Sequence, residues 1–385
     1  MEGWRRARVA ALLLSLALAA CGAGQSRASA APYRIGVVVS LTGSASQLGI
    51  GEANAARLAA REINDRGGAA GHRLDLLVRD DQSRPDQALQ QARELLQQHV
   101  VALVGPSVVA DCNAVMPLVQ DSGPIDYCLS PGIQPPNGSY VWSASVATGV
   151  FARRMMMYLK EQGLTRVALV STTDASGLDG ARATRAAVQS VGGVQLVADV
   201  QYPPTAVEVT SQLQQVKAAD PQAVVVWSTG TPAGVALKGL QQLEIDVPVV
   251  TTNGNLSYAF VQRIAAYAPR RLLIPATRDF WWDQLPKGSA AYRLESSYHQ
   301  AYEKAYGSPP DFGPGVGYDA IRILADVLGR AGSDPARMRS TLQSLKGFVG
   351  VVGVYRFAPD DHRGLGLDDV AMVQVSNGGF TYVGR

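Results

Sequence analysis

The stretch from Tyr33 to Gly51 constrains the fold of this chain more than any other part of the sequence. Residues 33–39 are nearly all apolar and rich in β-branched side chains, as in a parallel strand covered on both faces. The turn at 42–46 is small and polar, and residues 52–66 have the spacing of an amphipathic helix. In an open α/β sheet such a turn lies at the carboxyl edge, where small ligands bind. We therefore expect it to form one wall of a ligand site.

Strand and helix patterns alternate along most of the remaining chain. Between residues 72 and 274, short apolar segments are followed repeatedly by amphipathic ones, which predicts parallel sheets with right-handed crossovers. After residue 287 the pattern changes to long helices and then to short strands with a hairpin turn at 377–379. A chain of 385 residues is long for one core, so two α/β domains are expected.

The amino terminus is typical of a targeting segment. Three arginines precede an apolar run that is too short to span a bilayer comfortably. The run ends Leu-Ala-Ala-Cys21, which resembles the lipobox of an acylated lipoprotein; the alternative is an ordinary signal peptide cleaved after an Ala-x-Ala-like site. We expect residues 1–20 to be a lipoprotein signal peptide, Cys21 the lipidation site, and 21–32 a flexible tether.

Charge and cysteine content narrow the class of protein further. The formal net charge is +3, and most of this excess comes from the expected leader, so the sequence indicates no nucleic-acid partner. Two cysteines remain after the leader, Cys112 and Cys128, in a chain that is expected to be exported. A disulfide between them is one interpretation, and two buried thiols are the other.

The sequence shows no sign of catalysis, of a metal site or of a bound cofactor. Its four histidines have no metal-ligand spacing, and no serine stands in a Gly-x-Ser-x-Gly elbow. Gly49-x-Gly51 resembles part of a dinucleotide fingerprint, but it follows the strand too late and lacks the third glycine. We therefore expect no enzyme, no metal and no cofactor.

Several motifs together resemble the branched-chain amino-acid (Leu/Ile/Val) binding family. They are the Gly-rich first turn, the run Ala-Arg-Glu-Ile-Asn-Asp-Arg-Gly-Gly at 60–68, the Asp80-Asp81 pair, Val104-Gly-Pro106 and Gly317-Tyr-Asp-Ala320. These proteins are substrate-binding components of ABC importers with the type I periplasmic-binding-protein fold. The resemblance covers essentially residues 33–385.

The resemblance implies two Rossmann-like α/β lobes with parallel sheets, joined by three hinge crossings. The expected N-terminal lobe comprises 33–142 plus 275–345, and the C-terminal lobe 143–274 plus 346–385. The two lobes would close on a ligand like a Venus flytrap.

The resemblance also places the ligand in facing turns of the two lobes. Carried over to this chain, the ligand-binding residues are Ser44, Ser46, Gln47, Leu48, Ser107, Val108, Val109, Ser130, Gly132, Gln134, Asp174, Ser176, Thr229, Gly230, Asn253 and Asn255. Trp281 joins them as a possible stacking partner, with interdomain packing as the equal alternative. Asp111 and Asp174 lie in such turns as well, and the simpler interpretation of each is a helix N-cap.

The chain departs from the amino-acid binders at matching positions. Where the family places hydroxyl groups it has Val108-Val109-Ala110, and it has Gly254-Asn255 where an acid is expected for the ammonium group. A buried ammonium group without a carboxylate partner is costly. Together with Leu48, these positions favour a less polar ligand, such as an aromatic carboxylate.

The resulting prediction is an extracytoplasmic, lipid-anchored solute-binding protein that delivers a small molecule to an ABC permease. Its membrane contact would be the N-terminal anchor only. The alternative is a ligand-sensing receptor component of the same fold, which the sequence separates poorly from a transport protein. An enzyme on a Rossmann-like fold is a third hypothesis, and it lacks the motifs that it requires.

Overall fold

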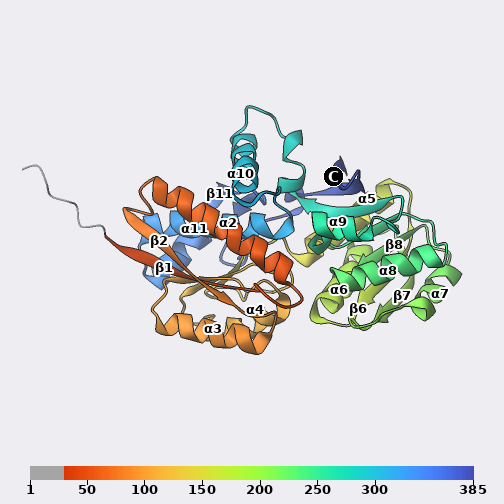
Figure 1. Cartoon of the computed structure of the whole chain (residues 1–385), viewed down its shortest axis with the longest axis horizontal. Coiled ribbons are helices and arrows are strands. Elements are labelled where there is room, and N and C mark those ends of the chain that lie inside the picture. Colours follow the sequence, from red (N-terminus) through yellow and green to blue (C-terminus); the bar gives the residue numbers. More distant parts are fainter. Residues whose placement is uncertain (1–29) are drawn as a thin grey trace, which may run out of the picture.

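The structure is a computed structural model, and it describes residues 30–385. Figure 1 shows two lobes side by side, with β1, α2 and α3 in one and β6, β8 and α8 in the other. The expected signal peptide, the lipidation site Cys21 and most of the tether lie outside the described residues.

A five-stranded parallel sheet forms the core of the first lobe. Its order is β2-β1-β3-β4-β5, and every neighbouring pair is parallel. The strands are β1 (Ala30–Val39), β2 (His72–Asp80), β3 (Ala102–Val104), β4 (Ile125–Cys128) and β5 (Val141–Ser143). The carboxyl ends of β1, β3 and β4 therefore lie next to each other at one edge.

Helices cover both faces of this sheet. On one face α2 packs along α11, and a continuous apolar core lies beneath them; on the other face α3 and α4 enclose a smaller core. The helices of this lobe are α2 (Ser46–Asp65), α3 (Pro85–Gln97), α4 (Val109–Val115), α10 (Ala290–Tyr306), α11 (Phe312–Ala331) and α12 (Pro335–Ser344). All but α4 are long enough to bury a full stripe of side chains.

A seven-stranded mixed sheet forms the second lobe, in the order β14-β13-β10-β9-β8-β6-β7. Its central strands are fully buried, and β13 and β14 join antiparallel at one end. The strands are β6 (Arg166–Thr172), β7 (Gln195–Tyr202), β8 (Ala223–Trp227), β9 (Val249–Thr251), β10 (Leu272–Thr277), β13 (Val370–Ser376) and β14 (Gly379–Gly384). The helices around it are α5 (Thr148–Glu161), α6 (Ala175–Val191), α7 (Thr210–Ala218), α8 (Thr231–Gln242) and α9 (Tyr258–Ile264).

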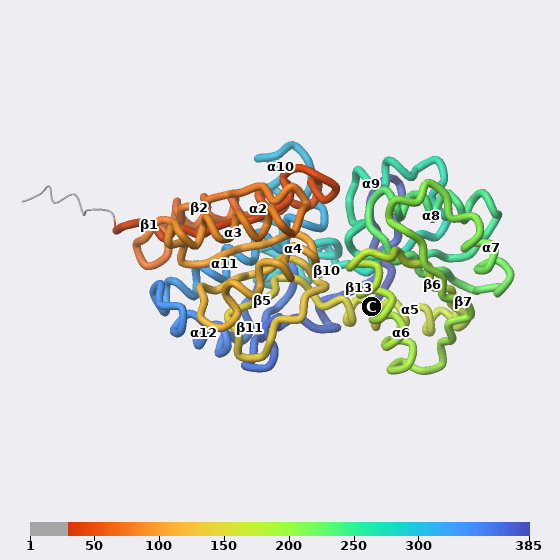
Figure 2. Tube along the Cα trace, turned by 90° about the horizontal axis from the view of Figure 1, so that it is seen from below, coloured from red at the N-terminus to blue at the C-terminus, as the bar shows by residue number. Residues whose placement is uncertain are grey.

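Three segments cross between the lobes, as the fold class predicted. They are residues 144–147, 278–289 and 357–369, and Figure 2 shows β10 and β13 near the junction. Short 3-10 helices lie in or beside them, η3 (Arg278–Phe280), η4 (Trp282–Gln284) and η5 (Leu367–Asp369). The prediction of two α/β lobes with three crossings is confirmed, and both sheets are parallel except for β13 and β14, which pair antiparallel in the second.

The strands place two of the crossings later in the chain than residues 275 and 346. Pro275 to Thr277 still pair with β13, because β10 runs to its end inside the second sheet. The hairpin of β11 (Lys346–Val349) and β12 (Val354–Arg356) contacts the first lobe instead, since Arg322 of α11 donates to the Val349 carbonyl at 3.0 Å.

Helix α2 begins at Ser46, six residues before the start expected from the sequence. Gly49 and Gly51 both lie inside the helix, close to its start. A Cβ atom on Gly49 would lie 2.2 Å from the Ser40 carbonyl oxygen. The glycine therefore serves the close approach of helix and strand, and Ser46, Gln47 and Leu48 form the first helical turn.

None of the helices in residues 30–385 is long and apolar enough to cross a membrane.

Candidate functional site

Three turns of the first lobe meet at the carboxyl edge of its sheet. They are residues 40–45 after β1, 105–108 after β3 and 129–134 after β4. The Ser40 amide donates to Ser107 Oγ at 3.3 Å, and the Leu129 amide donates to the Pro106 carbonyl at 3.2 Å. Parallel pairing therefore makes these three turns neighbours, as the resemblance implied.

A disulfide links the elements next to two of these turns, the one at 105–108 and the one at 129–134. Cys112 of α4 and Cys128 at the end of β4 are joined with an S–S distance of 2.01 Å and a Cα–Cα distance of 6.2 Å. Of the two interpretations left open by the sequence, the structure has the disulfide. The bridge fixes the helix that follows one turn to the strand that precedes the other.

The second lobe presents a matching set of turns after β6, β8 and β9. Asn255, in the 3-10 helix η2 (Asn253–Asn255), links two of them, because its Oδ1 accepts the Gly230 amide at 2.8 Å. Its Nδ2 donates to the Ser228 carbonyl at 2.8 Å and to Thr251 Oγ1 at 2.7 Å. Both ends of the Asn255 amide are thus used to hold the turns in place.

The two edges touch each other at both sides of the junction. On one side, Gln47 Nε2 of α2 donates to Ser257 Oγ of the second lobe at 2.5 Å. On the other side, a Cβ atom on Gly132 would lie 3.1 Å from Asp179 Oδ2 of α6. The first-lobe residues Gln47 and Gly132 therefore lie against the second lobe at Ser257 and Asp179.

An apolar cluster spans the junction beside Gln47. Leu256, Ile274 and Val373 of the second lobe pack there with Phe312 at the start of α11, and Leu48 lies against them. The Phe312 amide donates to the Leu256 carbonyl at 2.9 Å, which joins the lobes through their backbones. Leu48 is half-buried in this cluster, next to the hydroxyl-rich first turn.

The other candidate residues differ widely in exposure. Exposed are Ser44, Gln47, Gln134, Asp174, Ser176 and Thr229; half-buried are Ser46, Leu48, Val108, Val109, Gly132 and Gly230; buried are Ser107, Ser130, Asn253, Asn255 and Trp281.

Two of these candidate residues, Asp174 and Trp281, have clear structural roles. Asp174 caps α6 by accepting the Gly177 amide at 2.9 Å, so its simpler interpretation holds. Trp281 packs under the Arg385 guanidinium, 4.4 Å from the ring centre, and near Tyr382, which favours packing over stacking on a ligand.

Comparisons with known proteins agree with this architecture. The sequence profile described as periplasmic binding protein matches residues 32–379. The chain belongs to the periplasmic binding protein family. Its expected resemblance to the branched-chain amino-acid binding proteins, with the type I fold, is thereby confirmed. A search of curated proteins found no match.

Solved structures of this family superpose over nearly the whole chain. Rp1789 of Rhodopseudomonas palustris is 22% identical with a TM-score of 0.84, and the match covers 91% of this chain and 99% of that one. A type 1 periplasmic binding protein of Bordetella pertussis is 24% identical with a TM-score of 0.79, covering 92% and 100%. LivJ of Streptococcus pneumoniae, in complex with isoleucine, is 22% identical with a TM-score of 0.78, again covering 92% and 100%. At these identities the likeness shows the shared fold.

A group of buried carboxyl groups in this binding protein was not foreseen from the sequence. Glu52 of α2 is 1% exposed, and its Oε2 lies 2.5 Å from Ser107 Oγ. Asp81 Oδ1 accepts the Ser40 hydroxyl at 2.6 Å, and Asp111 is buried nearby. Burial raises the pKa of all three groups, to about 8 for Glu52 and to about 7 for Asp111. Glu52 looks like any charged helical residue in the sequence, so no pattern marks it.

Asp111 does not act as an N-cap. It lies inside the first turn of α4, and both carboxyl oxygens lack a hydrogen-bond partner among the described residues. The helix begins one residue after Val108, whose side chain cannot cap it. The cap interpretation is therefore wrong for Asp111, although it holds for Asp174.

Two further acids lie directly at the junction. Asp179 Oδ1 pairs with Arg182 on the same helix, while its Oδ2 is buried without a partner among the described residues. Asp311 precedes α11 and lies against Ser257 and Gln47. Burial raises the pKa of Asp311 to about 6, although its hydrogen bonds with Ser257 and Gln47 act in the opposite direction.

Arg363 on the third crossing holds the first lobe's turn and the first crossing together. Its Nη1 donates to Ser143 Oγ at 2.9 Å and to the Ser145 carbonyl at 3.0 Å, and its Nη2 donates to the Ile133 carbonyl. Burial lowers the pKa of Arg363 to about 10, whereas Asp179 and Asp361 raise it. The guanidinium therefore stays charged at neutral pH and anchors the turn at 131–134.

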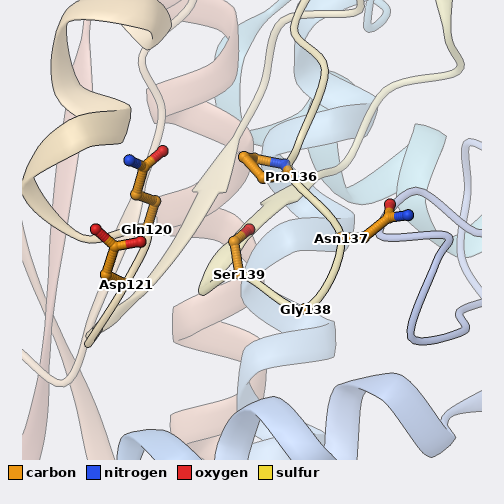
Figure 3. Close-up of a pocket in the computed structure, with 6 residues that line it drawn as sticks. All are labelled: Gln120, Asp121, Pro136, Asn137, Gly138 and Ser139. Atoms are coloured by element: carbon orange, nitrogen blue, oxygen red, sulfur yellow. The ribbon is translucent and has the colours of Figure 1, made fainter.

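Two surface pockets lie away from these turns. One, of about 380 Å³, is lined by Gln120, Asp121, Pro136, Asn137, Gly138 and Ser139 (Figure 3). The other, of about 340 Å³, adjoins the loop before β4 at Gly123 and Pro124. Both precede β4 or β5, at the amino edge of the sheet, and no candidate ligand residue lines them. Within residues 30–385, no cluster of three or more acidic, histidine or cysteine residues could hold a metal ion.

Proposed function

We propose that this protein captures a small, weakly polar carboxylate, such as an aromatic acid, between its two lobes and delivers it to an ABC importer. The membership of the periplasmic binding protein family supports an extracytoplasmic role in small-molecule binding. The apolar cluster that spans the junction beside the first turn is the observation that carries the choice of ligand.

The cluster favours an apolar ligand body because both lobes contribute to it. Leu48 and Phe312 come from the first lobe, and Leu256 comes from the second. An apolar group that packs against all three would gain burial only when the lobes are together. A ligand of this kind stabilises the closed arrangement over the open one, in proportion to its differential contacts.

The polar groups at the junction favour a carboxylate over an amino acid. Both junction acids are already engaged in part, since Asp179 Oδ1 binds Arg182 and Asp311 lies against Ser257 and Gln47, although Asp179 Oδ2 has no partner among the described residues. Asn255 occupies the position where the related binders are expected to carry an acid, and its amide is fully engaged. Backbone amides and hydroxyl groups remain, and these suit carboxylate oxygens.

The proposal also includes delivery to an importer and a lipid anchor at the N-terminus. The expected leader, which precedes Cys21, supports an exported, lipid-anchored protein that faces the periplasm or the cell exterior. LivJ is named for a branched-chain amino-acid transporter, which supports delivery to an importer. Three Rhodopseudomonas palustris structures are named extracellular ligand-binding receptors, which supports a sensing role as the second candidate.

The ligand proposal is tested by thermal denaturation against a panel. Benzoate, phenylacetate and related aromatic acids are compared with leucine, isoleucine and valine at equal concentration. We expect the aromatic acids to raise the melting temperature and to reduce the radius of gyration in solution scattering. Stabilisation by the amino acids alone would overturn the ligand class, and stabilisation by no small solute would overturn the binding role itself. Permease and ATPase genes beside the coding gene would favour import over sensing.

A further inference from the structure

Glu52 and Ser107 form a hydrogen-bonded pair directly beneath the candidate ligand turns. Ser107 Oγ lies 2.5 Å from Glu52 Oε2 and 3.3 Å from the Ser40 amide nitrogen. Glu52 belongs to α2 and Ser107 to the turn after β3, so the pair joins two walls of the site. The hydrogen between the two oxygens can come from either residue.

The surroundings of Glu52 disfavour a charged carboxylate. The residue is 1% exposed, its Oε1 has no hydrogen-bond partner, and no ion pair within residues 30–385 includes it. The charged group that acts on it is another acid, Asp81 on the turn after β2, and Asp81 in turn acts on Asp111 of α4. A buried acid with acidic neighbours and no cation keeps its proton. Burial thus raises the pKa of Glu52 to about 8, against the opposing hydrogen bond from Ser107.

The hydrogen-bonding capacity of Ser107 then decides what it offers to a ligand. A serine hydroxyl has one hydrogen to donate and two lone pairs to accept with. The Ser40 amide takes one lone pair, and a protonated Glu52 takes the other. The hydroxyl hydrogen of Ser107 is then free for a third partner.

We propose that Glu52 is a positioning residue that holds a proton at neutral pH and so makes Ser107 a hydrogen-bond donor to the ligand. The ligand must present an acceptor there, and a carboxylate oxygen is the strongest one available. If Glu52 loses its proton, Ser107 turns its hydrogen to Glu52 and presents only a lone pair. The inference rests on the proposed function, because it assigns the polar end of the same site.

The first test needs no ligand. The unfolding equilibrium is measured by denaturant between about pH 5 and pH 9 for the wild type, Glu52→Gln and Glu52→Ala. A folded-state pKa near 8 against 4.5 in the unfolded chain means that the folded state binds the extra proton. Between these two pKa values, loss of the Glu52 proton should raise the unfolding constant of the wild type (unfolded over folded) roughly tenfold for each unit of rising pH. Above pH 8 this group should raise it no further.

Glu52→Gln should lose this dependence while it keeps the structure, because a glutamine amide can donate to Ser107 as the protonated acid does. Glu208→Gln is the matched control, since Glu208 is exposed in a loop of the second lobe. It should follow the wild type at every pH. The same pH slope in the wild type and Glu52→Gln would show that Glu52 is ionised throughout and would overturn the proposal.

The second test uses benzoate and leucine as probes at pH 7 and pH 9. Whichever probe binds the wild type should lose roughly tenfold in affinity at pH 9, as expected when a donor to a charged acceptor is lost. Glu52→Gln should bind the probe at both pH values with the affinity that the wild type has at pH 7. Ser107→Ala should bind it more weakly at both pH values. Loss of binding in a folded Glu52→Gln protein would overturn the positioning role. Failure of both probes counts against the proposed function only, because the ligand-free slopes still decide whether Glu52 holds its proton.

Discussion

The side chain of Gln47 and the hydroxyl of Ser257 lie 2.5 Å apart, although 210 residues separate them in the chain. They belong to different lobes, and the half-buried Asp311 carboxyl lies against both. These three polar side chains link the two lobes beside the apolar cluster that contains Leu256 and Phe312. The arrangement of the two lobes therefore depends on contacts other than the three crossings.

The first prediction concerns the proton on Asp311. Its pKa rises from 3.8 to about 6 in the folded protein because of burial. The stabilising contribution of this proton is full below pH 3.8 and is lost as the pH rises through 6. As the pH rises from 4 to 7, the wild type should therefore lose unfolding free energy relative to Asp311→Asn. Asp283→Asn, at an exposed acid in η4, is the control and should show no such trend.

The second prediction concerns the apolar cluster at the junction. Phe312 is 7% exposed and packs with Leu256 and Val373 of the second lobe. Phe312→Ala should destabilise the protein by about 3 kcal/mol, from lost burial and the cavity left behind. Phe312→Leu should cost far less, because it keeps most of the apolar volume. Denaturant unfolding measures both, and equal losses in the two variants would count against packing as the cause.

The third prediction concerns the disulfide. The bridge between Cys112 and Cys128 closes a loop with a sequence separation of 16 residues, worth about 3 kcal/mol in the chain-entropy model. A thiol assay on the unreduced, denatured protein should find neither of these cysteines free. Cys112→Ser and Cys128→Ser should lower the unfolding free energy by similar amounts, and the double variant should add little. Two reactive thiols in the unreduced protein would contradict the bridge.

The fourth prediction concerns the buried guanidinium of Arg363. Arg363→Met would remove the donor to the Ile133 carbonyl, whereas Ser143 Oγ would still accept the Ser145 amide and the Ser145 carbonyl would still accept the Ser143 hydroxyl. An unsatisfied buried group costs about 1–3 kcal/mol, so the variant should lose about that much stability. Arg356→Met, on the exposed side of β12, is the control and should stay close to the wild type. Equal stability of the two variants in thermal and denaturant unfolding would show that Arg363 does not anchor the turn.

Local patterns predicted the alternating strands and helices and the turn at the carboxyl edge of the first strand, and the resemblance to the family implied two lobes with facing turns. Strand periodicity and turn residues such as Gly43 and Ser107 act over a few residues, and parallel pairing fixes which turns become neighbours. The start of α2 at Ser46 was missed by six residues, and within those residues Gly49 lies so close to Ser40 of the first strand that a Cβ atom would have no room.

The groups that tune the candidate site could not be predicted in this way. Glu52 and Asp179 lie on helices, where a charged residue usually faces solvent, and only the tertiary fold buries them. Arg363 follows two acids and a histidine in a polar segment, and its partners are more than 200 residues away. These residues are buried by contacts with segments that are distant in the sequence, and local periodicity contains no information about such contacts.

The last prediction concerns the close contact of the two lobes at Gly132. A Cβ atom there would lie 2.5 Å from Val109 Cγ2 in the same lobe and 3.1 Å from Asp179 Oδ2 in the other lobe. Gly132→Ala should therefore disturb both the turn and the junction. In Gly132→Ala combined with Val109→Ala, the clash within the lobe is relieved, and the contact with Asp179 remains.

This pair of variants separates the two effects. If Asp179 limits the approach of the lobes, the double variant should still show a larger radius of gyration in solution scattering than Val109→Ala alone. Adding Asp179→Ala should restore compaction, since the methyl group then has room at the junction. A double variant as compact as Val109→Ala would mean that the lobes do not meet at Gly132 in solution.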